Sequence, residues 1–104
     1  MIITTTGSIE GKSILQYHGI VAGEAVMGAN FVRDFFARIR DIVGGRSGSY
    51  QKVIKGARND AIDDLMDQAA ELGANAIVGI SFDTEVVGSS MLMVIATGTA
   101  VTID

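Results

Sequence analysis

Alternating apolar and polar positions predict strands at both ends of the chain. Residues 13–26 alternate between two faces and indicate one strand or a bent pair of strands. Residues 76–87 alternate in the same way, whereas residues 91–103 are apolar on both faces for most of their length. A short β-prone segment at residues 2–6 comes before them all. We expect both faces of the last strand to be covered, one by helices and the other by a second subunit.

The middle of the chain has helical spacing instead. Apolar residues recur every three or four positions across residues 30–43 and again across residues 50–72, which is typical of helices with one buried face. Asn30 and Ser49 are the expected N-caps of these helices. The glycine-rich segment 44–50 predicts a flexible joint between them. The expected order of elements is therefore β-β-α-α-β-β.

Three isolated glycines predict local features of the backbone. Gly19 and Gly23 interrupt the strand at residues 13–26, which indicates bulges or a close approach of another backbone. Gly73 predicts the end of the second helix, because glycine readily takes the left-handed conformation found there.

Length and composition restrict the protein class. The 104 residues fit one domain, and 48% of them are hydrophobic, as in a globular protein. The chain has no cysteine, which excludes disulfides, thiolate metal sites and thiol nucleophiles and favours a cytoplasmic protein. No apolar run is long enough to cross a membrane, and no signal peptide is evident. The net charge of −4 argues against nucleic acid as a partner.

The charges are distributed very unevenly. Seven of the eight basic residues lie between Arg33 and Arg58, a segment with a net charge of +5, whereas eight acids and no base follow from Asn59 onward. Within the second helix the basic half comes first, which is the reverse of what the helix dipole favours. Two explanations remain open: antiparallel packing of the two helices, or contact between the basic joint of one subunit and the acidic half of the next, which closes a ring.

Several polar groups are candidates for binding. Arg58 lies within the apolar arc of the second helix, which predicts a packed or ion-paired arginine, or an anion site beside the glycine joint. Such a site would also use Arg46, Ser47 and Tyr50. The joint matches neither a Walker loop nor a dinucleotide fingerprint. A ridge of acids could hold Ca²⁺ or Mg²⁺, although such a ridge is more often a solvated face: Asp60, Asp64, Asp67 and Glu71.

Catalytic groups are few. His18 is the only histidine, and it shares a strand face with Gln16 and Glu24, which favours a structural role. No nucleophile motif such as G-x-S-x-G is present. Asp83 and Glu85 could form a carboxylate pair, but two acids without a cleft do not make an acid–base site.

Five stretches of the chain together resemble the YbjQ-like family, which is sometimes labelled heavy-metal-binding. They are spread over the whole chain: Gly19–Glu24, Asp34–Tyr50, Ala57-Arg58, Leu72–Ala76 and Gly98–Val101. The resemblance implies a single α+β domain over residues 1–104, similar to a dodecin subunit, with a helical hairpin on an antiparallel sheet. It implies assembly into a ring, with a pentamer as the expected number of copies. It implies no activity.

The residues support two hypotheses of function. The first is a non-enzymatic ring, without a cofactor, that binds a small ligand or ion where subunits meet, such as a small anion or a metal ion. Neither a membrane nor nucleic acid is an expected partner. The second is a carboxylate-dependent enzyme with an inter-subunit active site containing Glu24, Asp83 and His18. Heavy metals prefer thiolate and imidazole ligands, so a metal site would depend on His18 side chains around a ring axis, with Glu24 as a further ligand.

Overall fold

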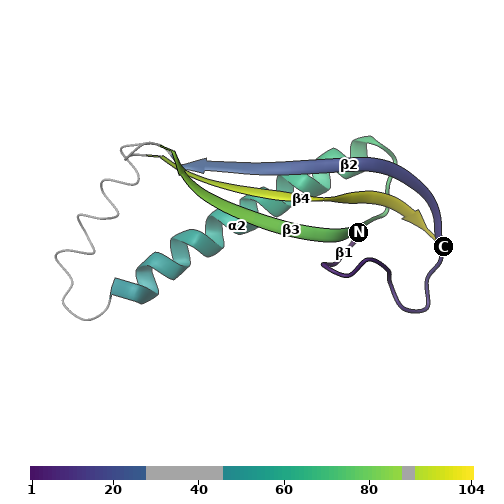
Figure 1. Ribbon diagram of the computed structural model, residues 1–104, viewed down its shortest axis with the longest axis horizontal. Helices are drawn as coiled ribbons and strands as arrows, with labels where there is room; N and C mark the ends of the chain where they lie inside the picture. The colour runs from purple at the N-terminus through teal and green to yellow at the C-terminus, as the bar shows by residue number, and fades with distance from the viewer. Residues whose placement is uncertain (28–45, 88–90) are drawn as a thin grey trace.

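The computed structural model describes residues 1–27, 46–87 and 91–104. Four strands form one sheet in the order β1-β3-β4-β2, and a long helix crosses one of its faces (Figure 1). The mixed α+β class is as predicted. The first predicted helix, residues 30–43, lies outside the described residues, so the helical hairpin stays a prediction. The elements are β1 (Ile2–Ile3), β2 (Ile14–Met27), α2 (Arg46–Glu71), β3 (Ala76–Val87) and β4 (Met91–Ile103).

The sheet is mixed, which corrects the expectation of a purely antiparallel one. The central strand β4 pairs antiparallel with both β2 and β3, but β1 runs parallel to β3, with Ile2 opposite Ala76. The reason is the path of the N-terminal segment, which runs beside β3 in the same direction as that strand. The N–H of Thr4 donates to the carbonyl of Ile77, and this contact holds the segment in place.

The helix begins earlier than its apolar pattern predicts. It starts at Arg46, so Ser49 lies in its first turn rather than at the N-cap, and residues 46–50 are helical rather than a joint. Adding a turn to a helix that has already formed has little cost, because only nucleation is unfavourable. Gly73 follows the helix with φ of +85°, which confirms the predicted stop. None of the described helical residues forms a stretch long and apolar enough to span a membrane.

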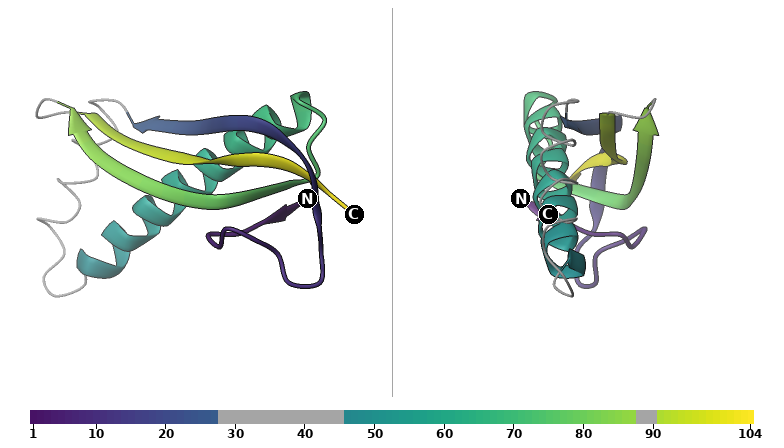
Figure 2. Two further views of the ribbon diagram at one scale, coloured as in Figure 1. Left: turned by 45° about the vertical axis from the view of Figure 1, so that its right-hand side comes forward. Right: turned by 90° about the vertical axis from the view of Figure 1, so that its left-hand side faces the viewer.

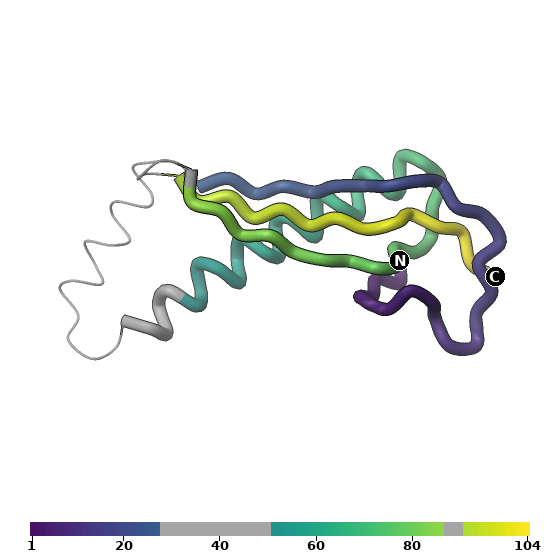
Figure 3. The backbone as a smooth tube through the Cα atoms, in the orientation of Figure 1, coloured from purple at the N-terminus to yellow at the C-terminus, as the bar shows by residue number. Residues whose placement is uncertain are grey.

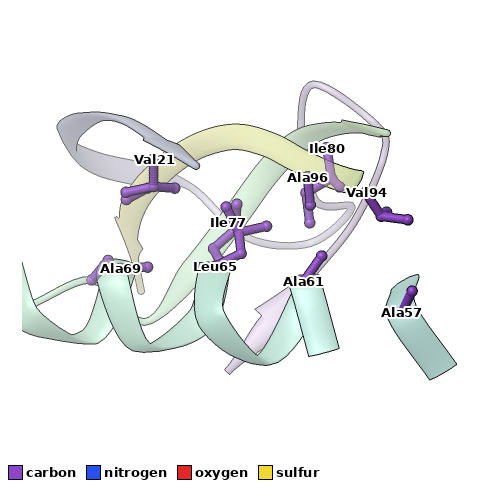
Figure 4. Packing of buried hydrophobic residues seen from close by; sticks show 11 residues of the cluster. Val21, Ala57, Ala61, Leu65, Ala69, Ile77, Ile80, Val94 and Ala96 are labelled. Carbon is purple, nitrogen blue, oxygen red and sulfur yellow. The ribbon is translucent and has the colours of Figure 1, made fainter. Parts of the chain in front are cut away.

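Small side chains bring α2 close to the sheet. The helix contributes a row of fully buried residues, spaced by four, that faces the strands (Figure 4): Ala57, Ala61, Leu65 and Ala69. Val21, Ile77 and Val94 meet this row from three different strands. Since three of the four helical residues are alanines, the helix axis can approach the sheet closely. The 26 residues of α2 extend about 39 Å diagonally across the sheet (Figure 2).

The opposite face of the sheet is covered at one end by the chain itself. Val101 and Ile103 of β4 form a second cluster with Ala76 and Val78, and Ile9 and Ile14 of the N-terminal region pack against it. The cover does not extend along the whole strand, because Met93 and Ile95 remain only partly buried. Cover of the rest of that face by a second subunit stays a prediction.

Glycine accounts for the irregularities of β2. The pairing of β2 with β4 shifts between Tyr17 and Gly19, and Gly19 has φ of +120°, so the predicted bulge is confirmed. A side chain would be strained in that backbone conformation. Because of the bulge, Ile20 pairs with Thr99 and projects from the face opposite α2, while Val21 points toward the helix.

Candidate functional site

A hollow lies between the outer edge of β2 and the C-terminal half of α2. Among the strands of residues 1–27, 46–87 and 91–104, β2 is the outermost and pairs with β4 alone, and the last turns of α2 rise beside it (Figure 3). The hollow, called the edge groove below, has a volume of about 560 Å³. Its lining consists of Ile20, Val21, Ala22 and Glu24 from β2, and Asp64, Gln68, Glu71 and Leu72 from α2 and its end.

One close contact between backbones positions the two walls of the edge groove. A Cβ atom built on Gly23 would lie 2.8 Å from the Cα of Leu65, and closer still to the carbonyl oxygen of Ala61. Only glycine fits there, which confirms the predicted close approach. The contact sets α2 directly on β2, so a polar side chain one position before Leu65 can reach the edge of the strand.

That side chain is Asp64. Its Oδ2 accepts a hydrogen bond from the backbone N–H of Glu24, with 3.0 Å between nitrogen and oxygen. The outward N–H groups of an edge strand otherwise lack a partner and offer a template for another strand. The Asp64 carboxylate therefore occupies, at this position, the place that a neighbouring strand would take.

The edge groove is negatively charged and partly apolar. Asp64 and Glu71 contribute carboxylates and Gln68 contributes an amide, and none of the residues that line the groove is basic. Glu24 lines the groove at the strand edge, with its side chain on the face of the sheet opposite α2. The rim of the groove includes Leu72, whose side chain is 47% exposed. Such a surface suits a ligand that combines positive charge or N–H donors with an apolar stem.

The basic half of α2 is also exposed. The side chains of Lys52, Lys55 and Arg58 all lie at the surface. The guanidinium of Arg58 stands over the ring of Phe82, 5.5 Å from its centroid, so this arginine packs on the core while its charge stays in solvent. This placement agrees with the prediction of a packed arginine.

The other residues of the predicted anion site are placed only by their backbone. Arg46, Ser47 and Tyr50 lie in the first turns of α2, and their side chains lie outside the described part of the structure. Arg58 is two to three turns further along the same helix. A joint role of these four residues in binding stays a prediction.

His18 and Glu24 do not meet within one subunit. They are six residues apart on β2, which separates them by about 20 Å in an extended strand. His18 is half-buried, and its Nε2 lies 2.7 Å from the Oγ1 of Thr102. Within residues 1–27, 46–87 and 91–104, no three His, Asp or Glu side chains gather in a way that could hold a metal ion. A metal site with both residues therefore requires more than one copy.

Glu24 and Asp83 share one row of the sheet. Both pair with Ile95 of β4, one from each side, so they project from the same face with about 10 Å between their Cα atoms. His18 lies well away from this row along β2. The cleft expected for a carboxylate-dependent enzyme is therefore incomplete in one subunit.

Sequence reasoning did not identify two polar residues that the structure makes important. Asp64 was interpreted as one member of an acidic ridge, and its contact with β2 depends on the packing of α2. Asn75 lies between the end of α2 and β3, where its Oδ1 accepts from the N–H of Ile103 at 2.7 Å and its Nδ2 donates to the carbonyl of Ile103 at 3.0 Å. The position of this asparagine, between the end of a helix and the start of a strand, is the one feature of the sequence that indicates hydrogen bonding to the backbone.

Comparison with known proteins gives a consistent result. Residues 1–104 match the YbjQ family model, whose description reads "Putative heavy-metal-binding". A UPF0145 protein of Carboxydothermus hydrogenoformans is 53% identical over 100% of this chain and 97% of its own length. A UPF0145 protein of Bacillus cereus is 58% identical over 99% of this chain and 100% of its own length.

A solved structure has the same fold. It is a crystal structure of a protein with unknown function of the DUF74 family from Pediococcus pentosaceus. The TM-score is 0.68 with 22% sequence identity, and the match covers 100% of this chain and 98% of that chain. At this level of identity the likeness concerns the fold.

Proposed function

The chain belongs to the YbjQ family, and on this basis we propose that it is a homo-oligomeric, non-enzymatic binding protein with its ligand or ion site between subunits. The main support is the exposed apolar surface of β2. Leu15, Tyr17 and Ile20 are 65%, 68% and 85% exposed, and they lie together on a strand that has one free edge. Exposed apolar groups on a free edge strand mark a surface that another chain covers.

The shape of the subunit supports the same proposal. Its dimensions are 53 × 24 × 16 Å, and its radius of gyration of 16.6 Å exceeds the value of about 13 Å expected for a compact domain of this length. One sheet covered by helix on one face buries little of the other face. A second copy would bury the part of the sheet face that the single subunit leaves exposed.

Closed assembly is the expected result. The two oppositely charged halves of α2 favour contact between unlike surfaces, and such contacts form a ring when the rotation between copies closes. Five copies is the number that the family resemblance implies. Size-exclusion chromatography with light scattering, followed by native mass spectrometry, should find one closed species. A monomer at micromolar concentration would overturn the proposal.

An anion is the proposed ligand at the basic end of α2. Arg58 is an exposed cation in this part of the helix. The site would be completed from the first turns of the helix by Arg46, Ser47 and Tyr50. Native mass spectrometry of the intact oligomer should detect a retained small anion. Loss of that mass in an Arg58→Gln variant that keeps the oligomer would support the role of this residue.

A metal ion is a second candidate, favoured by the description of the family. The nitrogen of His18 and the carboxylate of Glu24 are the proposed ligands, contributed by different copies. Titration calorimetry with Zn²⁺ and Cu²⁺ tests this directly, with His18→Ala as the variant and Lys12→Ala as a control. Absence of heat with the wild-type oligomer would exclude the site.

A carboxylate-dependent enzyme is the alternative, supported by the shared row of Glu24 and Asp83. It requires His18 of a neighbouring copy to reach that row. A crystal structure of the assembled oligomer distinguishes an enzyme from a binding protein. An interface cleft that contains all three side chains favours catalysis, and a closely packed interface without a cleft favours a binding or structural role.

A further inference from the structure

We propose that the edge groove of one subunit receives the basic half of α2 from a second copy. The occupying side chains are Lys52 and Lys55, with Arg58 at the margin of the contact. This inference depends on the proposed homo-oligomer, and it specifies which two surfaces meet.

Charge is the first argument. The groove carries the carboxylates of Asp64 and Glu71, with Glu24 at its strand edge and without a basic residue in its lining. The chain contains eight basic residues, and seven of them lie between residues 33 and 58. A second copy therefore offers a concentrated source of the charge that the groove lacks. Oppositely charged surfaces increase the rate of association and fix the orientation of the partners.

The length of α2 prevents the basic half of this helix from reaching the groove of its own subunit. Lys55 and Glu71 are sixteen residues apart on one straight helix, a separation of about 24 Å. The two charged halves point to opposite ends of the molecule. Each contact between copies therefore joins two different surfaces, as a closed ring or a filament requires.

A strand from another sheet is a poorer occupant of the same edge. The hydrogen bond from the N–H of Glu24 to Asp64 would have to break before a strand could pair there. The described free edge of β3 carries Asp83 and Glu85, whose charges would repel Glu24 and Asp64. Helix insertion keeps the bond intact and places unlike charges together.

The apolar part of the groove also fits lysine. Leu72 is exposed at the rim, and Val21 lines the groove on the strand side. Lysine carries four methylene groups that can pack on such side chains while the ammonium reaches a carboxylate. An acidic groove with an apolar rim therefore suits Lys52 and Lys55 better than it suits a hydrated inorganic cation.

Charge reversal with rescue tests the contact. Lys55→Glu and Glu71→Lys each place like charges in the interface, so each should raise the dissociation constant of the oligomer at least tenfold in sedimentation velocity. The double variant restores an opposite pair and should return the constant to within about threefold of the wild type. For the wild type, the constant should also rise with NaCl concentration, because salt screens exposed charges.

Matched controls separate contact from net charge. Lys12→Glu and Glu10→Lys produce the same two changes in net charge on exposed residues of the N-terminal segment, outside both surfaces. Both should leave the oligomer unchanged. Far-UV circular dichroism should show that all four single variants keep the fold.

The outcomes differ for the two proposals. If the wild type is an oligomer but Lys55→Glu and Glu71→Lys leave it intact, or weaken it no more than the control variants do, the groove contact is wrong and the oligomer stands. Failure of the double variant to recover association also contradicts the contact. A monomeric wild type at micromolar concentration overturns both proposals.

Discussion

Gly23 of β2 lies directly under the backbone of Leu65 in α2, and a Cβ atom added to the glycine would stand 2.8 Å from the Leu65 Cα. The contact joins the two elements that form the edge groove. It also brings Asp64 close enough to bond the next residue of the strand. Both the core and the proposed binding surface therefore depend on the absence of a side chain at this position.

We expect Gly23→Ala to lower the free energy of unfolding by about 1–3 kcal/mol or more, because the added methyl group overlaps backbone atoms that cannot rotate away. Denaturation by guanidinium chloride at fixed protein concentration measures the change. Gly56→Ala is the matched control. Gly56 lies within α2 with open space around it, so alanine there should stabilise the protein by about 0.5–1 kcal/mol. Equal effects of the two substitutions would contradict the close contact.

Asp64→Ala should expose the N–H of Glu24 to solvent, because the carboxylate that accepts its hydrogen bond is removed. Hydrogen exchange followed by NMR should show faster exchange at the Glu24 amide, with a loss of stability of about 1 kcal/mol. Asp64→Asn keeps an acceptor oxygen and should protect the amide partly. Asp63→Ala removes an exposed neighbouring acid and serves as the control. Unchanged protection of Glu24 in Asp64→Ala would rule out the bond.

Asn75→Ala should destabilise the protein by about 1–3 kcal/mol, because two hydrogen bonds to the backbone of Ile103 are lost at the end of the central strand. Asn75→Asp keeps the acceptor and loses the donor, so its effect should be intermediate. Asn59→Ala, at an exposed position of α2, should change the stability little. Thermal unfolding at one protein concentration measures all three. A wild-type transition for Asn75→Ala would contradict the assigned role.

Leu65 and Leu72 separate folding from association. Leu65 is fully buried, so Leu65→Ala should reduce the free energy of unfolding by about 2–5 kcal/mol. Leu72 is 47% exposed at the rim of the groove, so Leu72→Ala should have a small effect on folding and a clear effect on the dissociation constant of the oligomer. Urea denaturation and sedimentation velocity measure the two effects. An oligomer unaffected by Leu72→Ala would exclude this residue from the interface.

The order of the elements follows from the periodicity of the chain. The strands at Ile14–Met27, Ala76–Val87 and Met91–Ile103 agree with the predicted ones within one residue at each end. Alternation marks the first two, and a continuous apolar run marks the start of the third. The start of α2 was predicted four residues late, because the apolar pattern begins later than the backbone helix. Cap and joint residues carry local preferences that the continuation of a helix can override.

The sequence alone determined the strands, the buried row of α2, the bulge at Gly19 and the separation of charge, because each depends on local spacing or on counting residues. The tertiary structure decided that β2 lies at an edge, that β1 runs parallel to β3, and that Asp64 bonds Glu24. It also separated His18 from Glu24, although both lie on one predicted strand face. These features depend on which distant segments meet, and long-range packing determines those contacts rather than the preferences of neighbouring residues.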